Sequence, residues 1–320
     1  MPHSSTSLSL ALIQEAHARI RPYINLTPVM TSESLDAAAA AKLFFKCENL
    51  QKVGAFKARG ATNAVFSLSD AEAKPGVITH SSGNHAAAVA RAAKLRGIPA
   101  CIVMPDNSPS AKQESVKRYG GEIVFCAPTL AAREATAQQL MAKTGATLVH
   151  PYNDLRVMAG QGTSALELLE AVPDLDVVLC PVGGGGQLSG IATVMKSLRP
   201  SVQVMGVEPA GADDAQQSFR AGHIIQCVNP NTIADGLRVS LGDKTFAEIQ
   251  RYVDDMVTVS EAGIVRAMRL IWEVMKLVVE PSGAVAHAAV MEHKARFEGK
   301  RVAVVLSGGN LDLDRLPWQA

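Results

Sequence analysis

The chain has 320 residues, of which 48% are hydrophobic, 19% charged and 4% aromatic. This length predicts one large or two modest domains, and this composition is typical of a globular α/β protein with an aliphatic core. Because 31 basic residues nearly balance 30 acidic ones, we expect no nucleic-acid partner and no attraction to an anionic membrane.

The first predicted element is an amphipathic helix near the N-terminus. Apolar residues recur at helical spacing from Leu8 to Ile20, and the polar residues Gln14, Glu15 and His17 interrupt the run. This pattern is not that of a signal peptide, and no run reaches the roughly eighteen apolar residues that a membrane span needs. The five cysteines form no CxxC pair, which favours buried thiols in a reducing compartment. We therefore expect a cytoplasmic protein.

Short apolar runs rich in β-branched residues alternate with helical patterns along the rest of the chain. The runs predict strands at residues 43–46, 77–79, 100–104, 122–126, 177–181, 202–207 and 301–306. Alanine-rich stretches predict helices at residues 84–96 and 128–143. This alternation predicts parallel sheets wrapped by helices.

Glycine-containing turns follow three of the predicted strands, at residues 81–85, 181–187 and 307–310. Ligands of open α/β sheets bind beyond the carboxyl ends of strands, so we expect these turns to form one site. The second turn contains four successive glycines before a predicted helix at residues 188–198: Gly183, Gly184, Gly185 and Gly186. Such a backbone can curl so that its N–H groups converge on a phosphate, although the spacing matches neither a dinucleotide fingerprint nor a Walker loop.

Several ordered sequence blocks resemble the serine racemase and serine/threonine dehydratase family of fold-type II pyridoxal-phosphate enzymes, close to the 3-hydroxyaspartate ammonia-lyases. The similarity extends from about residue 27 to residue 312, and its blocks lie at residues 54–61, 81–85, 183–186, 207–209, 233–236, 280–284 and 306–310. The resemblance implies two open twisted, mostly parallel sheets wrapped by helices, a tryptophan synthase β-like fold. It also implies a large cofactor-binding domain (residues 1–66 and 154–320) and a small domain (residues 67–153).

The same resemblance implies roles for the residues that would hold pyridoxal 5′-phosphate. Lys57 would form the Schiff base and then take the Cα proton of the substrate. Phe56 would lie beside the ring, Asn84 would bind its 3-hydroxyl, and the four glycines would hold the phosphate. Ser307 would face the pyridine nitrogen, and because a hydroxyl cannot keep that nitrogen protonated as an aspartate can, elimination of a β-leaving group is favoured.

Substrate contacts follow from the resemblance in the same way. Ser81, Ser82 and His85 would present donors to the substrate carboxylate at a helix N-terminus. Ser82 also matches the proton donor on the opposite ring face that racemisation needs, which leaves racemase activity open. The remaining substrate-binding candidates are Arg133, Asp235 and Arg238. Arg133 matches a position that approaches a second carboxylate, which a guanidinium binds with two hydrogen bonds.

The resemblance also bears on metals, effectors and assembly. Glu208, Ala212 and Asp214 match the positions where family members bind a structural divalent cation, and oxygen ligands suit Mg²⁺, Mn²⁺ or Ca²⁺. Ala86 and Ala87 replace the Gly-Gln of racemases that bind ATP, so we expect no nucleotide activation. The chain ends at Ala320, where a C-terminal regulatory domain would otherwise follow, so we expect no feedback control. The resemblance implies a homodimer.

Three activities remain open from the sequence. The first is β-elimination of 3-hydroxyaspartate to oxaloacetate and ammonia. The alternatives are an L-serine/L-threonine dehydratase, and a serine or aspartate racemase with elimination as a side activity. A cofactor-binding protein without catalysis is disfavoured, because the chain has Lys57, Ser82 and Asn84 together.

Overall fold

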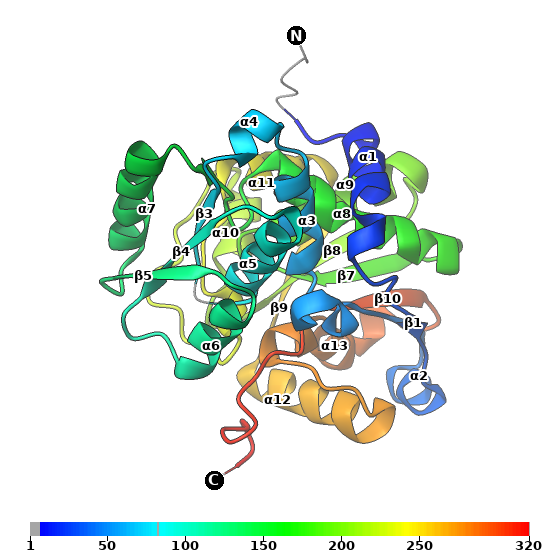
Figure 1. The fold of residues 1–320 in the computed structure, drawn as a ribbon. Helices are drawn as coiled ribbons and strands as arrows, with labels where there is room; N and C mark the ends of the chain where they lie inside the picture. The colour runs from blue at the N-terminus through cyan, green and yellow to red at the C-terminus, as the bar shows by residue number, and fades with distance from the viewer. Residues whose placement is uncertain (1–6, 82, 320) are drawn as a thin grey trace.

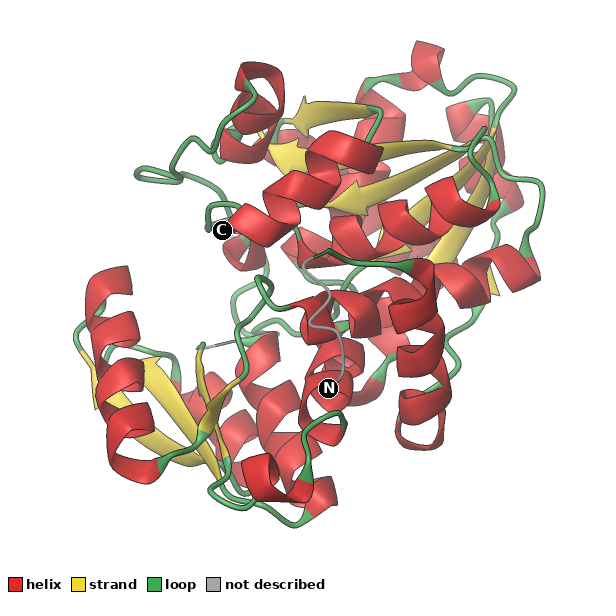
Figure 2. Ribbon diagram, turned by 90° about the horizontal axis from the view of Figure 1, so that it is seen from above, coloured by secondary structure: helices red, strands yellow, loops and turns green. Residues whose placement is uncertain are grey.

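The computed structural model describes residues 7–81 and 83–319, which form two sheets of different size that stand apart in Figure 2. The larger sheet has six strands in the order β1-β2-β10-β7-β8-β9, and the smaller has four in the order β5-β4-β3-β6. All neighbouring strands run parallel except β1 and β2. The predicted fold class is therefore confirmed.

The larger sheet is covered by helices on both faces (Figure 1). Val177 and Leu179 pack on one face with α12 and α13, whereas Val178 and Cys180 pack on the other with α1, α8 and α9. Burial on both faces explains why these strands are continuously apolar rather than alternating. Its strands are β1 (Val29–Met30), β2 (Lys42–Cys47), β7 (Val177–Pro181), β8 (Gln203–Pro209), β9 (Asp255–Val259) and β10 (Arg301–Leu306). Its helices are α1 (Leu10–Ile20), α2 (Glu33–Ala39), α8 (Leu155–Ala171), α9 (Gly186–Leu198), α10 (Asp214–Ala221), α11 (Asp243–Tyr252), α12 (Glu261–Leu270) and α13 (Pro281–Glu292).

The smaller sheet carries α3 and α5 on one face and α7 on the other. Its strands are β3 (Val77–His80), β4 (Ala100–Pro105), β5 (Glu122–Cys126) and β6 (Thr147–Leu148). Its helices are α3 (Lys57–Phe66), α4 (Asp70–Ala73), α5 (Asn84–Arg96), α6 (Ser110–Arg118) and α7 (Leu130–Thr144). Helix α3 also contacts α8 and α1, so it lies where the parts built on the two sheets meet.

Short helical turns complete the fold. Five are 3₁₀ turns, η1 (Arg21–Tyr23), η2 (Glu48–Leu50), η3 (Lys52–Gly54), η4 (Asp235–Leu237) and η6 (Lys294–Arg296), and one is a π-helical turn, η5 (Ile271–Met275). Three strands escaped prediction. The two-residue strands β1 and β6 are too short to show periodicity, and β9 begins with an aspartate, a residue that is depleted in strands.

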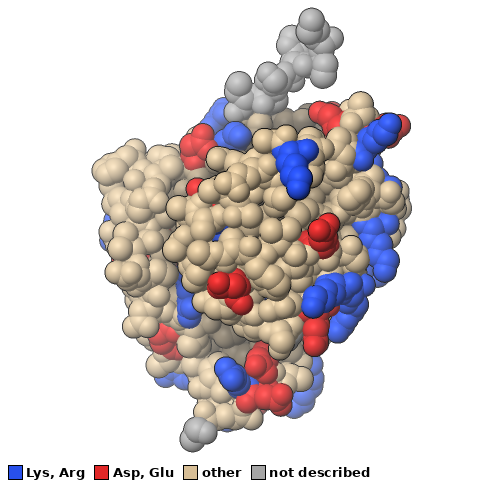
Figure 3. Space-filling model, turned by 60° about the vertical axis from the view of Figure 1, so that its left-hand side comes forward, with Lys and Arg blue, Asp and Glu red and all other residues tan. Residues whose placement is uncertain are grey.

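The surface agrees with the balanced composition. Basic and acidic side chains are interspersed on the face drawn in Figure 3. Within the described ranges, no helix combines the length and the apolar character that crossing a bilayer requires. The five cysteines are free, and Cys47 and Cys180 are buried whereas the other three are partly buried, so the expectation of buried thiols holds fully for two of them.

Candidate active site

Lys57 begins helix α3 at the place where that helix meets the end of β10. The backbone N–H of Phe56 donates to the carbonyl oxygen of Ser307 at 3.1 Å, and Ala55 forms an isolated antiparallel bridge with Gly308. Two of the predicted blocks, separated by about 250 residues in sequence, are therefore joined by backbone contacts. This junction fixes the first turn of α3, from which the Lys57 side chain extends.

The amine of Lys57 is desolvated and lacks a carboxylate partner among the described residues. Its Nζ donates to the carbonyl oxygen of Pro151 at 2.8 Å and lies 5.0 Å from the centre of the Phe56 ring. Burial lowers the pKa of Lys57 to about 8. A substantial fraction of this amine is therefore neutral near physiological pH, which is the form that attacks a carbonyl group.

The tetraglycine turn lies between β7 and α9, directly beneath Tyr152. A Cβ atom added at Gly184 would lie 2.2 Å from the Tyr152 ring, so no larger residue fits there. Gly185 has φ +84°, a backbone conformation that favours glycine. Since Pro151 accepts the hydrogen bond of Lys57 and Tyr152 is the next residue, one short segment connects the lysine with the turn. The turn opens the N-terminus of α9, where backbone N–H groups suit a phosphate.

Asn84 is held by a ring of hydrogen bonds that crosses from α5 to the larger sheet. Its Nδ2 donates to Glu280 Oε1 at 2.9 Å, and its Oδ1 accepts from Asn310 Nδ2 at 2.9 Å. The Asn310 backbone N–H donates to Glu280 Oε2 at 2.9 Å, which closes the ring. Burial raises the pKa of Glu280 to about 8. The sequence showed Glu280 only as part of a family block and gave it no role.

Three of the predicted substrate contacts lie in the turn before α5 and in the first turn of that helix. Ser81 Oγ accepts from the backbone N–H of Gly83 at 3.3 Å. His85 Nε2 lies 3.1 Å from the carbonyl oxygen of Val149, and its Nδ1 is buried without a partner in the described chain. Ser82 lies outside the described residues. At the other side of the site, the buried Ser307 hydroxyl donates to the carbonyl oxygen of Ser282 at 3.4 Å.

The two arginine candidates differ in their surroundings. Arg133 lies on α7, and its Nε is buried and has no hydrogen-bond partner within the ranges that the structure describes. Burial and then the charge of Arg133 lower the pKa of His80. Arg238, in contrast, donates through Nε to the carbonyl oxygen of Thr232 at 2.8 Å, within its own loop. Asp235 forms an ion pair with Lys112 at 2.5 Å, which links η4 to α6.

Comparison with known proteins places the chain in a family. Residues 20–308 match the family model described as "Pyridoxal-phosphate dependent enzyme". The chain belongs to this family. It is 52% identical to the beta-hydroxyaspartate dehydratase of Paracoccus denitrificans over 95% of this chain and 96% of that protein. It is also 52% identical to the serine racemase of Arabidopsis thaliana over 96% of this chain and 94% of that protein. The solved structure of maize serine racemase superposes with a TM-score of 0.94 at 50% identity, covering 96% of this chain and 95% of that one.

The residues around Lys57 fit the cofactor of this pyridoxal-phosphate dependent enzyme. The site combines a desolvated lysine amine, a glycine turn at a helix N-terminus, and an asparagine amide held in one orientation. These groups suit, in turn, an aldehyde, a phosphate and a ring hydroxyl.

The predicted cation ligands lie at the end of β8 and the start of α10. Both oxygens of Glu208 accept backbone hydrogen bonds, from Ala215 at 3.1 Å and Gln216 at 2.7 Å. Both carboxylate oxygens of Asp214 are buried, and the described chain offers them only the weak donor of the Cys227 thiol; burial outweighs it and raises the pKa of Asp214 to about 6. No cluster of three or more His, Cys, Asp or Glu side chains suited to a metal occurs in residues 7–81 and 83–319. Two carboxylates with the carbonyl of Ala212 form a smaller donor set, and the buried oxygens of Asp214 fit a cation.

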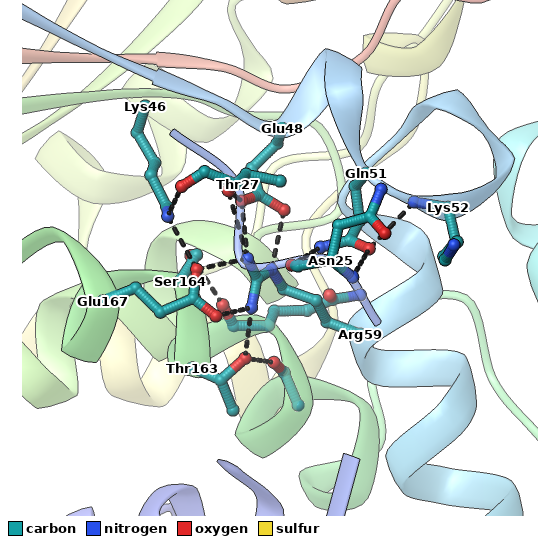
Figure 4. Close-up of polar contacts among 12 residues, drawn as sticks. Asn25, Thr27, Lys46, Glu48, Gln51, Lys52, Arg59, Thr163, Ser164 and Glu167 are labelled. Carbon is teal, nitrogen blue, oxygen red and sulfur yellow. Dashed lines mark hydrogen bonds and ion pairs between the residues drawn. The ribbon is translucent and has the colours of Figure 1, made fainter. Parts of the chain in front are cut away.

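A buried ion cluster is centred on Arg59, two residues after Lys57, and the sequence analysis missed it (Figure 4). The Arg59 guanidinium is fully buried and donates to both carboxylate oxygens of Glu48, at 2.7 and 2.8 Å, and to both of Glu167, each at 2.7 Å. Lys46 Nζ donates to Glu167 at 2.6 Å, so two cations face two carboxylates. The hydroxyl groups of Thr27 and Thr163 accept the remaining Arg59 bonds. The cluster joins four elements, β2, η2, α3 and α8, through side chains that meet at Arg59.

Proposed function

We propose that this enzyme eliminates water from 3-hydroxyaspartate, and that the resulting enamine, once converted to its imine, takes up water again and releases ammonia, giving oxaloacetate. The observation that carries the substrate assignment is the unpartnered, partly buried guanidinium of Arg133 near His80, which ends β3 directly before the turn at Ser81. A charge in such surroundings is costly without a counterion, and the second carboxylate of a dicarboxylic substrate supplies one. The 52% identity to a beta-hydroxyaspartate dehydratase supports the same assignment.

The proposed cofactor contacts use the groups around Lys57. Lys57 would hold the cofactor and later accept the Cα proton at Nζ, since its lowered pKa makes it a base in the neutral range. The four glycines would hold the phosphate, Asn84 the ring hydroxyl, and Phe56 the side of the ring. When bound, pyridoxal phosphate withdraws electrons from the Cα of an attached amino acid and so acidifies its proton.

Ser307 would direct the reaction towards elimination. Its hydroxyl already donates to a carbonyl oxygen, so towards a ring nitrogen it would offer a neutral group rather than a carboxylate. A nitrogen with this neighbour stays largely unprotonated, which favours early departure of the 3-hydroxyl group. The α-carboxylate would be received by Ser81, Ser82 and His85 at the N-terminus of α5, with Asp235 and Arg238 at the edge of the site.

The proposal also includes a bound divalent cation, a dimeric assembly and a cytoplasmic location. We propose that Glu208, Asp214 and the carbonyl of Ala212 bind Mg²⁺, Mn²⁺ or Ca²⁺ and that residues 67–153 act as a small domain. We also propose a cytoplasmic homodimer. Thermal unfolding with each chloride salt after EDTA treatment tests the cation site: binding raises the melting temperature, and Asp214→Asn should remove that rise.

The function is tested by product release. Purified protein loaded with pyridoxal phosphate would be given each stereoisomer of 3-hydroxyaspartate, L-serine and L-threonine, and 2-oxo acid and ammonia would be measured. We expect at least one 3-hydroxyaspartate isomer to give the highest kcat/KM. A higher value for serine or threonine would contradict the proposal and favour the dehydratase alternative.

A second candidate, a serine or aspartate racemase with elimination as a side activity, is favoured by the similarity to serine racemases. Chiral chromatography of reactions with L-serine and L-aspartate tests it. Formation of the D-isomers faster than 2-oxo acid would establish racemisation as the main activity.

A further inference from the structure

Helix α11 contacts the tetraglycine turn through one buried hydroxyl group. Thr245 lies in the first turn of α11, and its Oγ1 donates to the carbonyl oxygen of Gly184 at 2.8 Å. The same Oγ1 accepts the backbone N–H of Gly242 at 3.0 Å, and the Gly242 carbonyl oxygen is farther away than that of Gly184, at 3.1 Å. The shorter distance places the single proton of this hydroxyl on the side of the turn.

A second buried hydroxyl binds the next carbonyl of the turn. Ser189 Oγ lies 2.8 Å from the carbonyl oxygen of Gly185 and 3.2 Å from that of Thr245, so it is at the contact between α9 and α11. The backbone N–H of Ser189 also donates to the Gly185 carbonyl oxygen, at 2.9 Å. The carbonyl groups of Gly184 and Gly185, which follow each other in the chain, are therefore both held by hydroxyl groups of these two helices.

Peptide geometry decides where the N–H groups of the turn point. The described peptide bonds are all trans, and in a trans peptide the C=O and N–H bonds share a plane and point in opposite directions. Because the carbonyls of Gly184 and Gly185 face the two hydroxyl groups, the N–H groups of Gly185 and Gly186 point away from them. Neither N–H has a backbone hydrogen-bond partner in the described chain. Two successive free N–H groups suit an anion.

The first turn of α11 is itself fixed to the segment beside Lys57. The side chain of Asn153 accepts the backbone N–H of Lys244 at 3.0 Å and donates to Asp243 Oδ1 at 2.6 Å. Pro151, two residues before Asn153, accepts the hydrogen bond of the Lys57 amine. Thr245 is therefore held in place relative to the lysine, and its hydroxyl is a fixed point from which the turn can be oriented.

We propose that Thr245 is a positioning residue for the cofactor phosphate: its hydroxyl holds the Gly184 carbonyl and so directs the N–H of Gly185 towards the phosphate. The inference rests on the proposed role of the four glycines, which it describes in more detail. Glycine peptides change orientation at little steric cost, so without this hydroxyl the Gly184 carbonyl is free to turn towards the phosphate, whose charge it repels. Thr245 itself touches neither the phosphate nor the substrate.

The test compares pyridoxal phosphate with pyridoxal, which has the same ring and aldehyde but no phosphate. Each is titrated into cofactor-free protein and followed by its visible absorbance. Thr245→Val keeps nearly the same volume and removes the hydroxyl. We expect this substitution to weaken pyridoxal phosphate binding about 5- to 30-fold, with pyridoxal binding changed less than about threefold.

Two further variants separate positioning from general packing. Thr245→Ser keeps the hydroxyl, and it should bind pyridoxal phosphate within about threefold of the unsubstituted protein. The matched control is Thr193→Val, which removes an equally buried hydroxyl from α9, one that donates to the Ser189 carbonyl oxygen at 2.9 Å. This control should leave both affinities unchanged. An equal loss for both ligands in Thr245→Val, or no loss for either, would overturn the positioning role.

If Thr245→Val does not fold, the unsubstituted enzyme crystallised with pyridoxal phosphate decides the question. The backbone nitrogen of Gly185 should then lie about 2.7–3.2 Å from a phosphate oxygen, and a separation beyond hydrogen-bonding distance refutes the proposal. Unsubstituted protein that binds pyridoxal phosphate no better than pyridoxal would contradict the proposed glycine contacts, and this inference with them. A preference for pyridoxal phosphate that survives unchanged in Thr245→Val would contradict this inference alone.

Discussion

Arg59, two residues after Lys57 on α3, and Arg133, on α7, have charges that are satisfied in opposite ways. Arg59 is fully buried and is paired with Glu48 and Glu167, with Lys46 balancing the second carboxylate. Arg133 is only partly buried, and its Nε has no partner in the described chain. A buried cation whose hydrogen bonds are all used supports the fold, whereas one with unused donors is ready for a ligand. The difference separates the structural arginine from the one that we assign to substrate binding.

The largest effect is expected at Lys57, two residues before Arg59. Lys57→Ala should reduce kcat by roughly 10³-fold or more, because the substitution removes both the cofactor linkage and the base. The measurement is 2-oxo acid release by protein supplied with excess pyridoxal phosphate. A neighbouring exposed lysine, Lys52→Ala, should retain full activity, and comparable activity in the two variants would contradict the assignment.

The next effect is on the stability of the fold, and it tests whether Arg59 has a structural role. Arg59→Met should lower the free energy of unfolding by about 3–5 kcal/mol, because it leaves buried carboxylates with only Lys46 as partner. Urea unfolding followed by circular dichroism measures it. The matched control is Arg269→Gln, which breaks an exposed ion pair with Glu273 and should cost less than about 1 kcal/mol. A similar cost for the two variants would remove the distinction between the arginines.

Replacing Arg133 should have a smaller effect on activity, and one that is selective for a substrate with a second carboxylate. Arg133→Gln should reduce kcat/KM for 3-hydroxyaspartate about 10- to 100-fold, since a charge-assisted hydrogen bond is lost. The value for L-serine should change less than about threefold, and the free energy of unfolding by less than about 0.5 kcal/mol. Equal losses for both substrates in steady-state assays would show that Arg133 does not bind a second carboxylate.

The smallest effect is a pH dependence that reports the absence of a counterion at Lys57. Burial lowers the pKa of its amine to about 8, so the reactive neutral form is gained as pH rises through that value. The rate of loading the cofactor-free protein with pyridoxal phosphate should increase about fivefold from pH 7 to pH 8 and less than about twofold from pH 8 to pH 9. A tenfold rise in each step is the behaviour of an ordinary lysine and would show that the amine is not desolvated.

Much of the fold was predictable because most strands are short apolar runs rich in β-branched residues. The strand at 177–181, the strand at 122–126 and the helix at 84–96 agree with β7, β5 and α5 residue by residue. Helix α9 begins at Gly186, two residues before the predicted start, because the last glycine of the turn already takes a helical conformation. Glycine gives no propensity signal for such a start.

The site was predictable where contiguous motifs carry it and not where distant residues meet. The motif around Lys57 and the glycine turn pointed to the site directly, and the chain's family agrees with them. The pairing of Arg59 with Glu167 joins residues 108 positions apart, and the ring of Asn84, Glu280 and Asn310 joins three segments. No local pattern encodes such contacts.

The most direct measurement is identification of the lysine that carries the cofactor. The loaded protein would be reduced with borohydride, which makes the lysine–cofactor linkage permanent, and then digested for peptide mass spectrometry. We expect the pyridoxyl group on the peptide that contains Lys57, and its loss in Lys57→Ala. Modification of a different lysine, or of none, would contradict the site on which the proposed function depends.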